Sequence, residues 1–235
     1  MPKVSQEYFD NKNKTILEAA MRVFQKKPAY SVTMKDIIRE SGLSQGGVYK
    51  YYLNIDYIIV ALLNTSNITI NPKELLDIYK DDPERAIFEL FDAFRKFFFI
   101  AEKELGKIMF ELQAFFFNNK ERLKVLRDNI NKNLIPHYWF SDLFRFIDKK
   151  IDEKYFKPIL KPNDIYMQMI VAVSGIGNEL ILNKYYDLGI KLYYYTEEEN
   201  KDKKDLDSYL NSLIDTLYKT LLLLLGSKNV NKYSF

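Results

Sequence analysis

Eleven residues near the N-terminus, GLSQGGVYKYY from Gly42 to Tyr52, carry side chains that could bind bases and phosphates. The amide of Gln45 could pair with adenine through two hydrogen bonds, and the ammonium of Lys50 could bind guanine or a phosphate. Tyr49 and Tyr51 could each pack a ring and still offer a hydroxyl to a phosphate. Alternatively, Gln45 and Lys50 are ordinary surface residues and the two tyrosines only pack. The choice depends on the elements that position these side chains.

The residues before this stretch predict two helices. Apolar residues at helical spacing predict the first over Thr15–Lys26. Thr33, followed by Asp36 three residues later, has the pattern of a capping box and predicts the start of the second. Gly42 stands where a helix end requires a left-handed residue, so the second helix should end there.

A third short helix should follow after a three-residue turn. Ser44 can cap this helix, which should run to about Tyr52, and Asn54 can cap a fourth helix after it. Two short helices separated by such a turn are typical of the helix-turn-helix arrangement.

The glycine pair Gly46 and Gly47 is unfavourable inside a helix, at about 1 kcal/mol each relative to alanine. A loop would explain both glycines more simply. Val48 and Tyr52, however, are spaced i, i+4 and could dock a helix onto its neighbours. Glycine also lets a helix backbone approach base edges, and the first-turn amides point toward phosphate.

The positive charge is concentrated in this opening segment. Residues 1–57 carry nine Lys or Arg against six Asp or Glu, which leaves 26 of each sign in the remainder and the whole net charge of +3 in the segment. Such an excess is weak evidence for a polyanionic partner. Several lysines could add non-specific attraction, although each could also be an ordinary solvated residue; they are Lys12, Lys14, Lys26, Lys27 and Lys35.

The rest of the chain predicts longer helices and no sheet, because strand-like alternation is missing. Pro136 should kink one of them, since its ring removes a backbone hydrogen bond. The expected helices cover residues 83–104, 104–117, 119 to about 152, 163–187 and 205–225.

The pattern Thr33-x-x-x-Ile37-x-x-x-Ser41-Gly42-Leu43-Ser44-x-Gly46-x-Val48-Tyr49-x-Tyr51-Tyr52 resembles the DNA-binding motif of the tetracycline-repressor (TetR) family of transcriptional regulators. The likeness covers about residues 12–63, and the later helices fit the family by length and number only. It implies that Thr33, Tyr49 and Tyr51 contact phosphates. It also implies that Gln45 and Gly46 lie at the base-reading end of the recognition helix. The predicted DNA-binding residues are Thr33, Lys35, Ser44, Gln45, Gly46, Gly47, Tyr49, Lys50 and Tyr51.

The chain departs from this pattern at three places. Tyr51 and Tyr52 stand where the family usually has His and Phe, which are mild changes. Leu53 and Ile55 stand where the family commonly has a phosphate-holding lysine at the start of the fourth helix. Lys50 or Lys35 could supply the missing charge, and the sequence does not choose between them.

The resemblance also implies an all-α plan with two domains: a three-helix DNA-binding domain over residues 1–57 and a helical effector-binding and dimerisation domain over residues 58–235. Homodimerisation is expected through residues 163–187 and 205–225. Small residues in the first segment, Gly175 and Gly177 among them, would permit close helix packing there.

An effector cavity is expected in the helical body, which is rich in aromatic residues. Three consecutive aromatics on a helix spread over about 200° of its circumference, so one core face cannot take them all. Some must line a cavity, face a partner or remain exposed, although each ring taken alone is more often part of a core. The predicted lining is Phe94, Phe98, Met109, Leu112, Phe116, Tyr138 and Met169.

Other classes of protein find less support in the sequence. The chain has no cysteine and one histidine, His137, so it offers no thiolate metal site, nucleophilic cysteine or catalytic triad, and we expect no cofactor, metal or catalytic residue. No segment reaches roughly 18 uninterrupted apolar residues, so a soluble cytoplasmic protein is expected.

The sequence thus predicts a homodimeric regulator, a repressor of a palindromic operator that is released by a small apolar or aromatic effector. The alternatives are a DNA-binding protein of the same fold without an effector and, with less support, an all-helical enzyme. The identity and charge of the effector, the operator sequence and the regulated genes are not encoded in a recognisable way.

Overall fold

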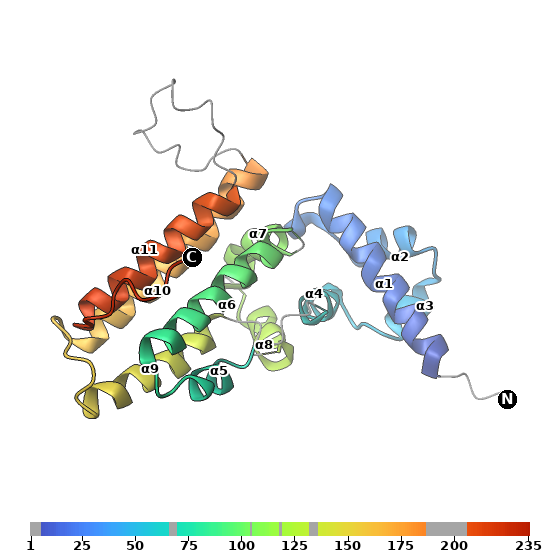
Figure 1. Ribbon diagram of the computed structural model, residues 1–235. Helices are drawn as coiled ribbons and strands as arrows, with labels where there is room; N and C mark the ends of the chain where they lie inside the picture. Colours follow the sequence, from blue (N-terminus) through green and yellow to red (C-terminus); the bar gives the residue numbers. More distant parts are fainter. Residues whose placement is uncertain (1–5, 66–69, 104, 118, 132–135, 187–205) are drawn as a thin grey trace, which may run out of the picture. The chain divides into compact units, whose positions relative to one another are not determined.

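The computed structural model describes residues 6–65, 70–103, 105–117, 119–131, 136–186 and 206–235, and in these residues it contains helices and no strand (Figure 1). The predicted all-α class is therefore confirmed. The chain divides into two compact units, unit 1 with residues 1–67 and 107–134, and unit 2 with residues 68–106 and 135–235. The predicted functional boundary at residue 57 falls inside a helix of unit 1 and stays a prediction.

Unit 1 contains the four N-terminal helices and two that come later in the chain. They are α1 (Gln6–Lys26), α2 (Met34–Ser41), α3 (Gln45–Tyr49), α4 (Ile55–Asn64), α7 (Gly106–Phe117), of which Gly106 itself is grouped with unit 2, and α8 (Lys120–Asn129). A single 3₁₀ turn, Ala29–Ser31, joins α1 to α2.

Helix α1 buries the predicted apolar face but begins nine residues earlier than expected. Ile16, Ala20, Val23 and Phe24 are all buried. The helix starts at Gln6 rather than at Thr15 because polar side chains stabilise its first turns, as where the Gln6 amide donates to Asp10 Oδ1 at 3.0 Å.

Helices α7 and α8 are joined to the N-terminal helices of unit 1 by side-chain contacts over long sequence distances. The Ala29 N–H donates to Glu111 Oε2 of α7 at 2.5 Å. In α8, Arg122 donates from both Nε and Nη2 to one oxygen of Asp56, a buried carboxylate at the start of α4. The side-chain amide of Asn64, at the end of α4, donates to the Asn129 carbonyl at the end of α8 and accepts from the Asn131 N–H just after it.

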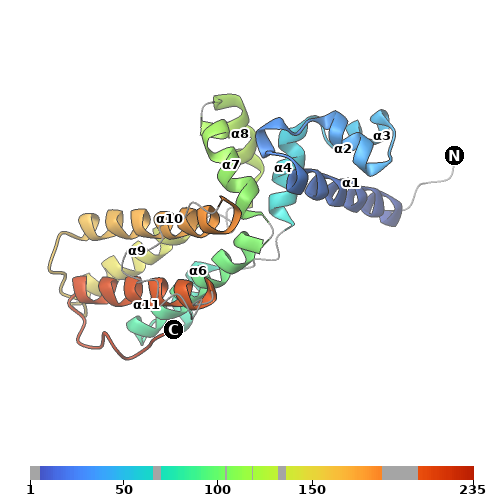
Figure 2. The ribbon, with the colours of Figure 1, turned by 90° about the horizontal axis from the view of Figure 1, so that it is seen from above.

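Unit 2 is organised around α6 (Pro83–Lys103), which packs against the other four helices of the unit. These are α5 (Pro72–Ile78), α9 (Pro136–Asp152), α10 (Pro162–Tyr186) and α11 (Leu206–Leu224), and Figure 2 shows the same helices from a second direction. The core is largely aromatic: Phe94 of α6 lies 5.0 Å from Trp139 and 5.1 Å from Phe140 of α9, measured between ring centres.

One predicted helix is in fact two. The expected kinked helix over residues 119–152 is wrong, because α8 ends at Asn129, the following residue Ile130 is extended, and a new helix begins at Pro136. Proline is favoured at the first position of a helix, where its missing N–H is not needed. The proline therefore starts α9 instead of bending a longer helix.

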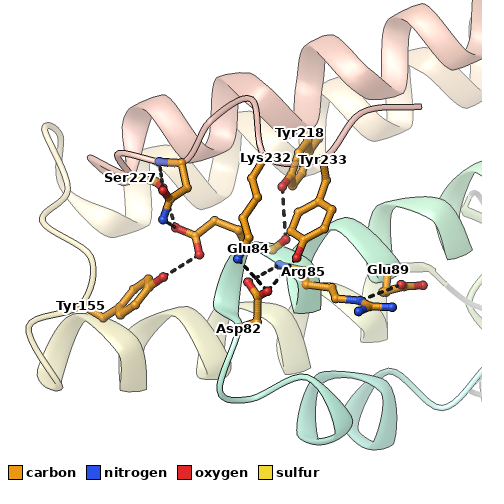
Figure 3. Close-up of polar contacts among 10 residues, drawn as sticks. Asp82, Glu84, Arg85, Glu89, Tyr155, Tyr218, Ser227, Lys232 and Tyr233 are labelled. Atoms are coloured by element: carbon orange, nitrogen blue, oxygen red, sulfur yellow. Dashed lines mark hydrogen bonds and ion pairs between the residues drawn. The ribbon is translucent and has the colours of Figure 1, made fainter.

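The last residues of the chain fold back onto unit 2 as a C-terminal clasp, residues 226–235 (Figure 3). Its centre is Glu84, a buried carboxylate in the first turn of α6. Glu84 accepts hydrogen bonds from the Tyr155 hydroxyl and the Ser227 hydroxyl, both at 2.6 Å, and from the Asn229 amide at 3.4 Å. Burial and the nearby Glu84 carboxylate raise the pKa of Tyr155 to about 12.

A second carboxylate, Asp82, holds the outer part of the clasp (Figure 3). It accepts hydrogen bonds from Lys232 Nζ at 2.8 Å and from the Tyr233 hydroxyl at 2.7 Å. The ring of Phe235 then stacks on Phe88 of α6 with 4.4 Å between ring centres. The clasp is thus fixed to the first turns of α6 by both polar and aromatic contacts.

Helix α10 combines one tight internal contact with a largely exposed apolar surface. A Cβ atom added at Gly177 would lie 2.9 Å from the ring of Phe98, so glycine is needed there for α10 to approach α6. By length and composition α10 could cross a bilayer, and 33% of its most apolar window is buried within the chain. A single helix of this kind is weak evidence for a membrane span, since helices of soluble proteins pass the same test.

Candidate nucleic-acid interface

The turn between α2 and α3 is built from the caps that the sequence predicts. The Asp36 N–H donates to Thr33 Oγ1 at 3.3 Å, and the Thr33 N–H donates back to Asp36 Oδ2 at 3.0 Å, which completes the capping box of α2. Gly42 ends α2 with φ = +67°, a left-handed conformation that glycine adopts at no steric cost. The Ser44 hydroxyl then caps α3 by accepting from the Gly47 N–H at 3.1 Å.

Helix α3 presents a polar face outward and an apolar face inward. Val48 is fully buried and Tyr52, just after the helix, is also buried, as their spacing predicts. Gln45, Gly46 and Tyr49 are exposed. The face that remains accessible therefore carries one long amide side chain, one bare backbone position and one phenol.

The two glycines of α3 differ in their surroundings. No described atom lies within 4 Å of a Cβ built at Gly46, whereas one built at Gly47 would lie 3.1 Å from Ser44 Oγ. Packing within the chain thus explains why residue 47 is glycine, since a side chain there would crowd the Ser44 cap of α3. It does not explain why residue 46 is glycine. The thin surface at Gly46 is free for close approach by another molecule.

Lys50 is oriented by an aromatic residue of α1. Its ammonium lies 4.5 Å from the ring centre of Phe9, within the range of a cation–π interaction. The ring of Tyr51 lies 6.1 Å from the same Phe9 ring. Partial burial, together with nearby Tyr8 and Asp10, raises the pKa of Tyr51, so its hydroxyl stays protonated and able to donate at neutral pH.

Sequence reasoning missed this contribution of Phe9, because the first helix was expected to begin only at Thr15. The i, i+4 pair of Tyr8 and Lys12, whose ammonium lies 5.6 Å from the Tyr8 ring centre, was an available signal for the earlier start. This signal would have extended the first predicted helix toward the N-terminus, so that it included Phe9 and Lys12.

Neither Leu53 nor Ile55 supplies a lysine or arginine at the start of α4, as the sequence indicates. Leu53 is 72% exposed, Asn54 caps the helix by accepting from the Asp56 N–H at 2.9 Å, and Ile55 is half-buried. Lys35 is exposed in the first turn of α2. The structure therefore leaves two exposed lysines, Lys35 and Lys50, on the two helices of the motif.

The hydroxyl of Thr33 is engaged within the chain. It donates to Asp36 Oδ2 at 2.7 Å, so a phosphate contact from this hydroxyl requires that hydrogen bond to be exchanged. Lys27, at 2.7 Å, and the Thr33 hydroxyl lower the pKa of Asp36 from 3.8 to about 2. Asp36 consequently stays ionised, and Lys27 and Arg39 offset its negative charge beside the motif.

The predicted effector-binding residues are divided between the two units. Phe94, Phe98 and Met169 are buried in unit 2, and Leu112 is buried in unit 1, whereas Tyr138 is 40% exposed on α9. The side chains of Met109 and Phe116 lie outside the described residues. The expectation that the seven form one cavity stays a prediction.

Within the described residues, no group of three or more His, Cys, Asp or Glu side chains could hold a metal ion. The side chain of His137 lies outside the described part of the chain. The geometry of α2 and α3 remains the clearest functional feature.

Comparison with known proteins places this motif. Residues 16–62 match the family model described as "Bacterial regulatory proteins, tetR family". The uncharacterized HTH-type transcriptional regulator YfiR of Bacillus subtilis (strain 168) is 29% identical over 167 residues, which cover 67% of this chain and 74% of YfiR. The chain is thus similar to TetR-family transcriptional regulators, and the matched residues contain its helix-turn-helix motif.

Solved structures of TetR-type regulators share the fold at low sequence identity. A TetR transcription regulator from Haloarcula marismortui ATCC 43049 superposes with a TM-score of 0.55 at 16% identity, covering 92% of this chain and 97% of that one. NalD of Pseudomonas aeruginosa, the secondary repressor of the MexAB-OprM multidrug efflux pump, superposes with a TM-score of 0.52 at 15% identity, covering 91% of this chain and 97% of that one. The shared helical fold therefore extends over nearly the whole chain.

Proposed function

We propose that this chain is a TetR-family regulator that binds a palindromic operator as a homodimer in the cytoplasm and represses transcription until a small apolar or aromatic effector binds its helical body. The observation that carries the proposal is the face of α3. Val48 fixes the helix from behind while Gln45 and Gly46 face outward at its N-terminal end. Recognition helices of this class read base edges with their N-terminal residues.

Gln45 and Gly46 have complementary roles in this proposal. The Gln45 amide can donate to and accept from adenine in the major groove. Gly46, around which a Cβ would meet no described atom, lets the backbone come close enough for that side chain to reach. Gly47 and Ser44 maintain the first turn, whose amides favour a phosphate.

Phosphate binding is assigned to the residues at the edges of the motif. Lys50, held over Phe9, takes the place of the lysine that Leu53 and Ile55 leave absent at the start of α4. Tyr49, Tyr51, Lys35 and Thr33 contribute further backbone contacts. Such contacts fix register on the duplex without reading sequence.

Dimerisation is assigned to α10 and α11, which pack side by side in unit 2 (Figure 1). Met167 and Val171 of α10 are 60% and 66% exposed, and Leu223 of α11 is 58% exposed. The small residues Ser174 and Gly175 are exposed on α10 as well. A partner subunit that covers this surface would remove apolar area from water and permit a close four-helix contact.

Repression is proposed because NalD, which has a similar fold, is a repressor. An inverted repeat is expected because a twofold dimer presents its two recognition helices to half-sites about one helical turn apart. The prediction is tested by selecting binding sequences for the full-length chain from random duplex DNA. Enrichment of an inverted repeat supports it, and a selected pool without a shared motif contradicts it.

Effector release is assigned to movement of α7 and α8 relative to the DNA-binding helices of unit 1. Glu111 of α7 contacts Ala29, and Arg122 of α8 contacts Asp56. A shift of α7 or α8 would therefore displace residues next to α2 and at the start of α4. The predicted lining is Phe94, Phe98, Met109, Leu112, Phe116, Tyr138 and Met169. An effector must favour the DNA-incompetent state by about 1–3 kcal/mol to act in this way.

Arg122 tests this coupling. Arg122→Met leaves the Asp56 carboxylate buried without its cation, so unfolding free energy should fall by about 3–5 kcal/mol. The pair Asp56→Asn with Arg122→Gln avoids the unpaired charge and should recover most of that stability while reducing effector-induced release of DNA. Calorimetry and an operator-release assay measure the two effects, and full release by the double variant would contradict the role of this pair.

The same fold acting without an effector is the alternative. Thermal-shift screening of small apolar and aromatic compounds distinguishes the two functions, because an effector that binds the folded chain raises its melting temperature. A compound that raises the melting temperature and releases operator DNA supports the proposal. If such a compound released operator DNA equally well from the Phe98→Ala variant, the predicted lining of the effector cavity would be rejected.

A further inference from the structure

Unit 2 carries a hollow of about 230 Å³ between α5 and α9 that no part of the proposed operator or effector binding uses. Its residues recur at helical spacing on both sides. Positions 142, 145, 146, 149 and 150 form one stripe of α9, and positions 73, 76, 77 and 80 form a matching stripe of α5 and the turn after it. Two helical faces are therefore turned toward the same space.

The lining is strongly cationic. It contains five basic side chains and two carboxylates; the basic residues are Lys73, Lys80, Arg145, Lys149 and Lys150, and the carboxylates are Asp77 and Asp142. Like charges gathered around one concave surface raise the local concentration of anions.

Part of this charge is balanced within the chain and part is not. Arg145 donates to Asp142 at 2.6 Å, and Lys150 pairs with Glu153 at 2.7 Å. Lys73 and Lys80, by contrast, form no ion pair within 4.0 Å among the residues that the structure describes. The α5 side of the hollow thus offers two exposed ammonium groups to a bound anion.

The hollow also has an apolar part. Leu76 of α5 is buried and Phe146 of α9 is half-buried. The Lys150 ammonium lies 5.8 Å from the centre of the Phe146 ring, at the edge of the distance for a cation–π contact. A ligand can therefore place a small apolar group beside Leu76 and Phe146 while a charged group meets the lysines.

We propose that this hollow binds a small organic carboxylate with a compact apolar or aromatic body. A hollow of about 230 Å³ has room for a small organic molecule, and its exposed ammonium groups beside Leu76 and Phe146 favour one that joins a carboxylate to an apolar body. The site is separate from the predicted effector lining, and its test does not depend on operator binding.

The test is calorimetric titration of the full-length chain, without DNA, with sodium benzoate and with benzamide, a neutral molecule of almost the same shape. Benzoate should bind at least tenfold more tightly than benzamide, and raising sodium chloride from about 50 to 300 mM should weaken benzoate binding severalfold. Equal binding of the two compounds overturns the proposal, because the cations would then contribute nothing.

Matched variants locate the site. Lys73→Gln with Lys80→Gln should weaken benzoate binding at least tenfold, whereas Lys161→Gln with Lys228→Gln, which removes two exposed lysines elsewhere in unit 2, should leave it unchanged. Equal losses in the two double variants would mean non-specific attraction and overturn the site. Circular dichroism verifies that each variant is folded.

A gain of binding provides a second criterion. Asp77→Asn removes a carboxylate from the lining and should tighten benzoate binding severalfold. Unchanged or weaker binding in this variant contradicts the proposal. Hexaglutamate is titrated in the same way. If it bound more tightly than benzoate, the hollow would be assigned to an acidic peptide and the proposed ligand class would be overturned.

Discussion

The exposed faces of α3 and α10 contrast in chemistry although each is proposed to meet a macromolecule. Helix α3 shows Gln45, Gly46 and Tyr49, whereas α10 shows Met167, Val171 and a strip of small residues. A base edge is recognised by hydrogen bonds at close range, so the α3 face is polar and thin. A permanent protein partner is held by removal of apolar surface from water, so the α10 face is apolar.

The contrast extends to what lies behind each face. Helix α3 has five residues and depends on the Ser44 cap and on Val48 for its position. Helix α10 has 25 residues, and Gly177 lets it pack closely onto α6. A short reading helix therefore requires cap and anchor residues, while a long packing helix can rely on its length and buried area.

The largest effect is expected at α10. Val171→Asp introduces a charge at the centre of the proposed subunit contact, where it would be desolvated without a partner. The variant should become monomeric by analytical ultracentrifugation and lose operator affinity by more than about a hundredfold. Ile159→Asp is the control, since Ile159 is 67% exposed, close to the 66% of Val171, but lies outside α10. A dimeric Val171→Asp would remove α10 from the interface.

The next effect concerns the thin surface of α3. Gly46→Ala meets open space, so stability should be unchanged or raised by up to about 1 kcal/mol, while operator affinity should fall about tenfold. Gly47→Ala, which places a Cβ 3.1 Å from Ser44 Oγ, should instead lower stability by about 1 kcal/mol. Thermal unfolding measures the effect on stability, and fluorescence-anisotropy titration measures the effect on operator affinity. Unaltered DNA binding by Gly46→Ala would contradict a close approach of the α3 backbone to DNA at this position.

A smaller effect is expected from Lys50. Lys50→Gln should weaken binding to every DNA sequence by a similar factor and reduce the slope of log affinity against log salt by about 1. Phe9→Leu, which removes the ring under the Lys50 ammonium, should produce part of the same loss. Lys161→Gln, which removes an exposed lysine of unit 2, is the control. An unchanged slope in Lys50→Gln would mean that Lys50 is not the phosphate-holding lysine.

The smallest effect is a pH dependence in the motif itself. Because Lys27 and Thr33 lower the pKa of Asp36 to about 2, the carboxylate stabilises the fold above about pH 4 and this contribution is lost as the pH falls toward 2. Asp36→Asn should lower stability by about 1 kcal/mol at pH 7 and flatten the difference between pH 4 and pH 2. Thermal unfolding of the wild-type protein and of Asp36→Asn between pH 2 and pH 7 measures this difference in stability. If the stability of both proteins changed equally with pH, Asp36 would not be the group responsible.

The sequence predicts the motif well because its determinants are local. Thr33 with Asp36, Gly42 and Ser44 act within a few residues, and each takes the cap position expected of it. Short-range caps and turn residues depend little on the rest of the chain. The same locality explains why the buried face of α1 was predicted correctly.

Features that depend on distant residues were not predictable. The C-terminal clasp joins Asp82 and Glu84 to side chains up to 151 positions away in the sequence. No local sequence pattern predicts such a contact. The different surroundings of Gly46 and Gly47 and the position of Phe9 under Lys50 likewise appear only when helices are packed. Pro136 was misjudged because the residue alone does not say whether a helix bends or begins there.

The most direct measurement is equilibrium binding of the full-length chain to its own upstream DNA and to a shuffled duplex of equal length, across a salt series. The account predicts two chains per bound duplex and a preference for the upstream DNA of at least a hundredfold. That preference should persist as salt rises, while both affinities decline. Equal affinities for the two duplexes at every salt concentration would contradict specific recognition of an operator in that DNA by the face of α3.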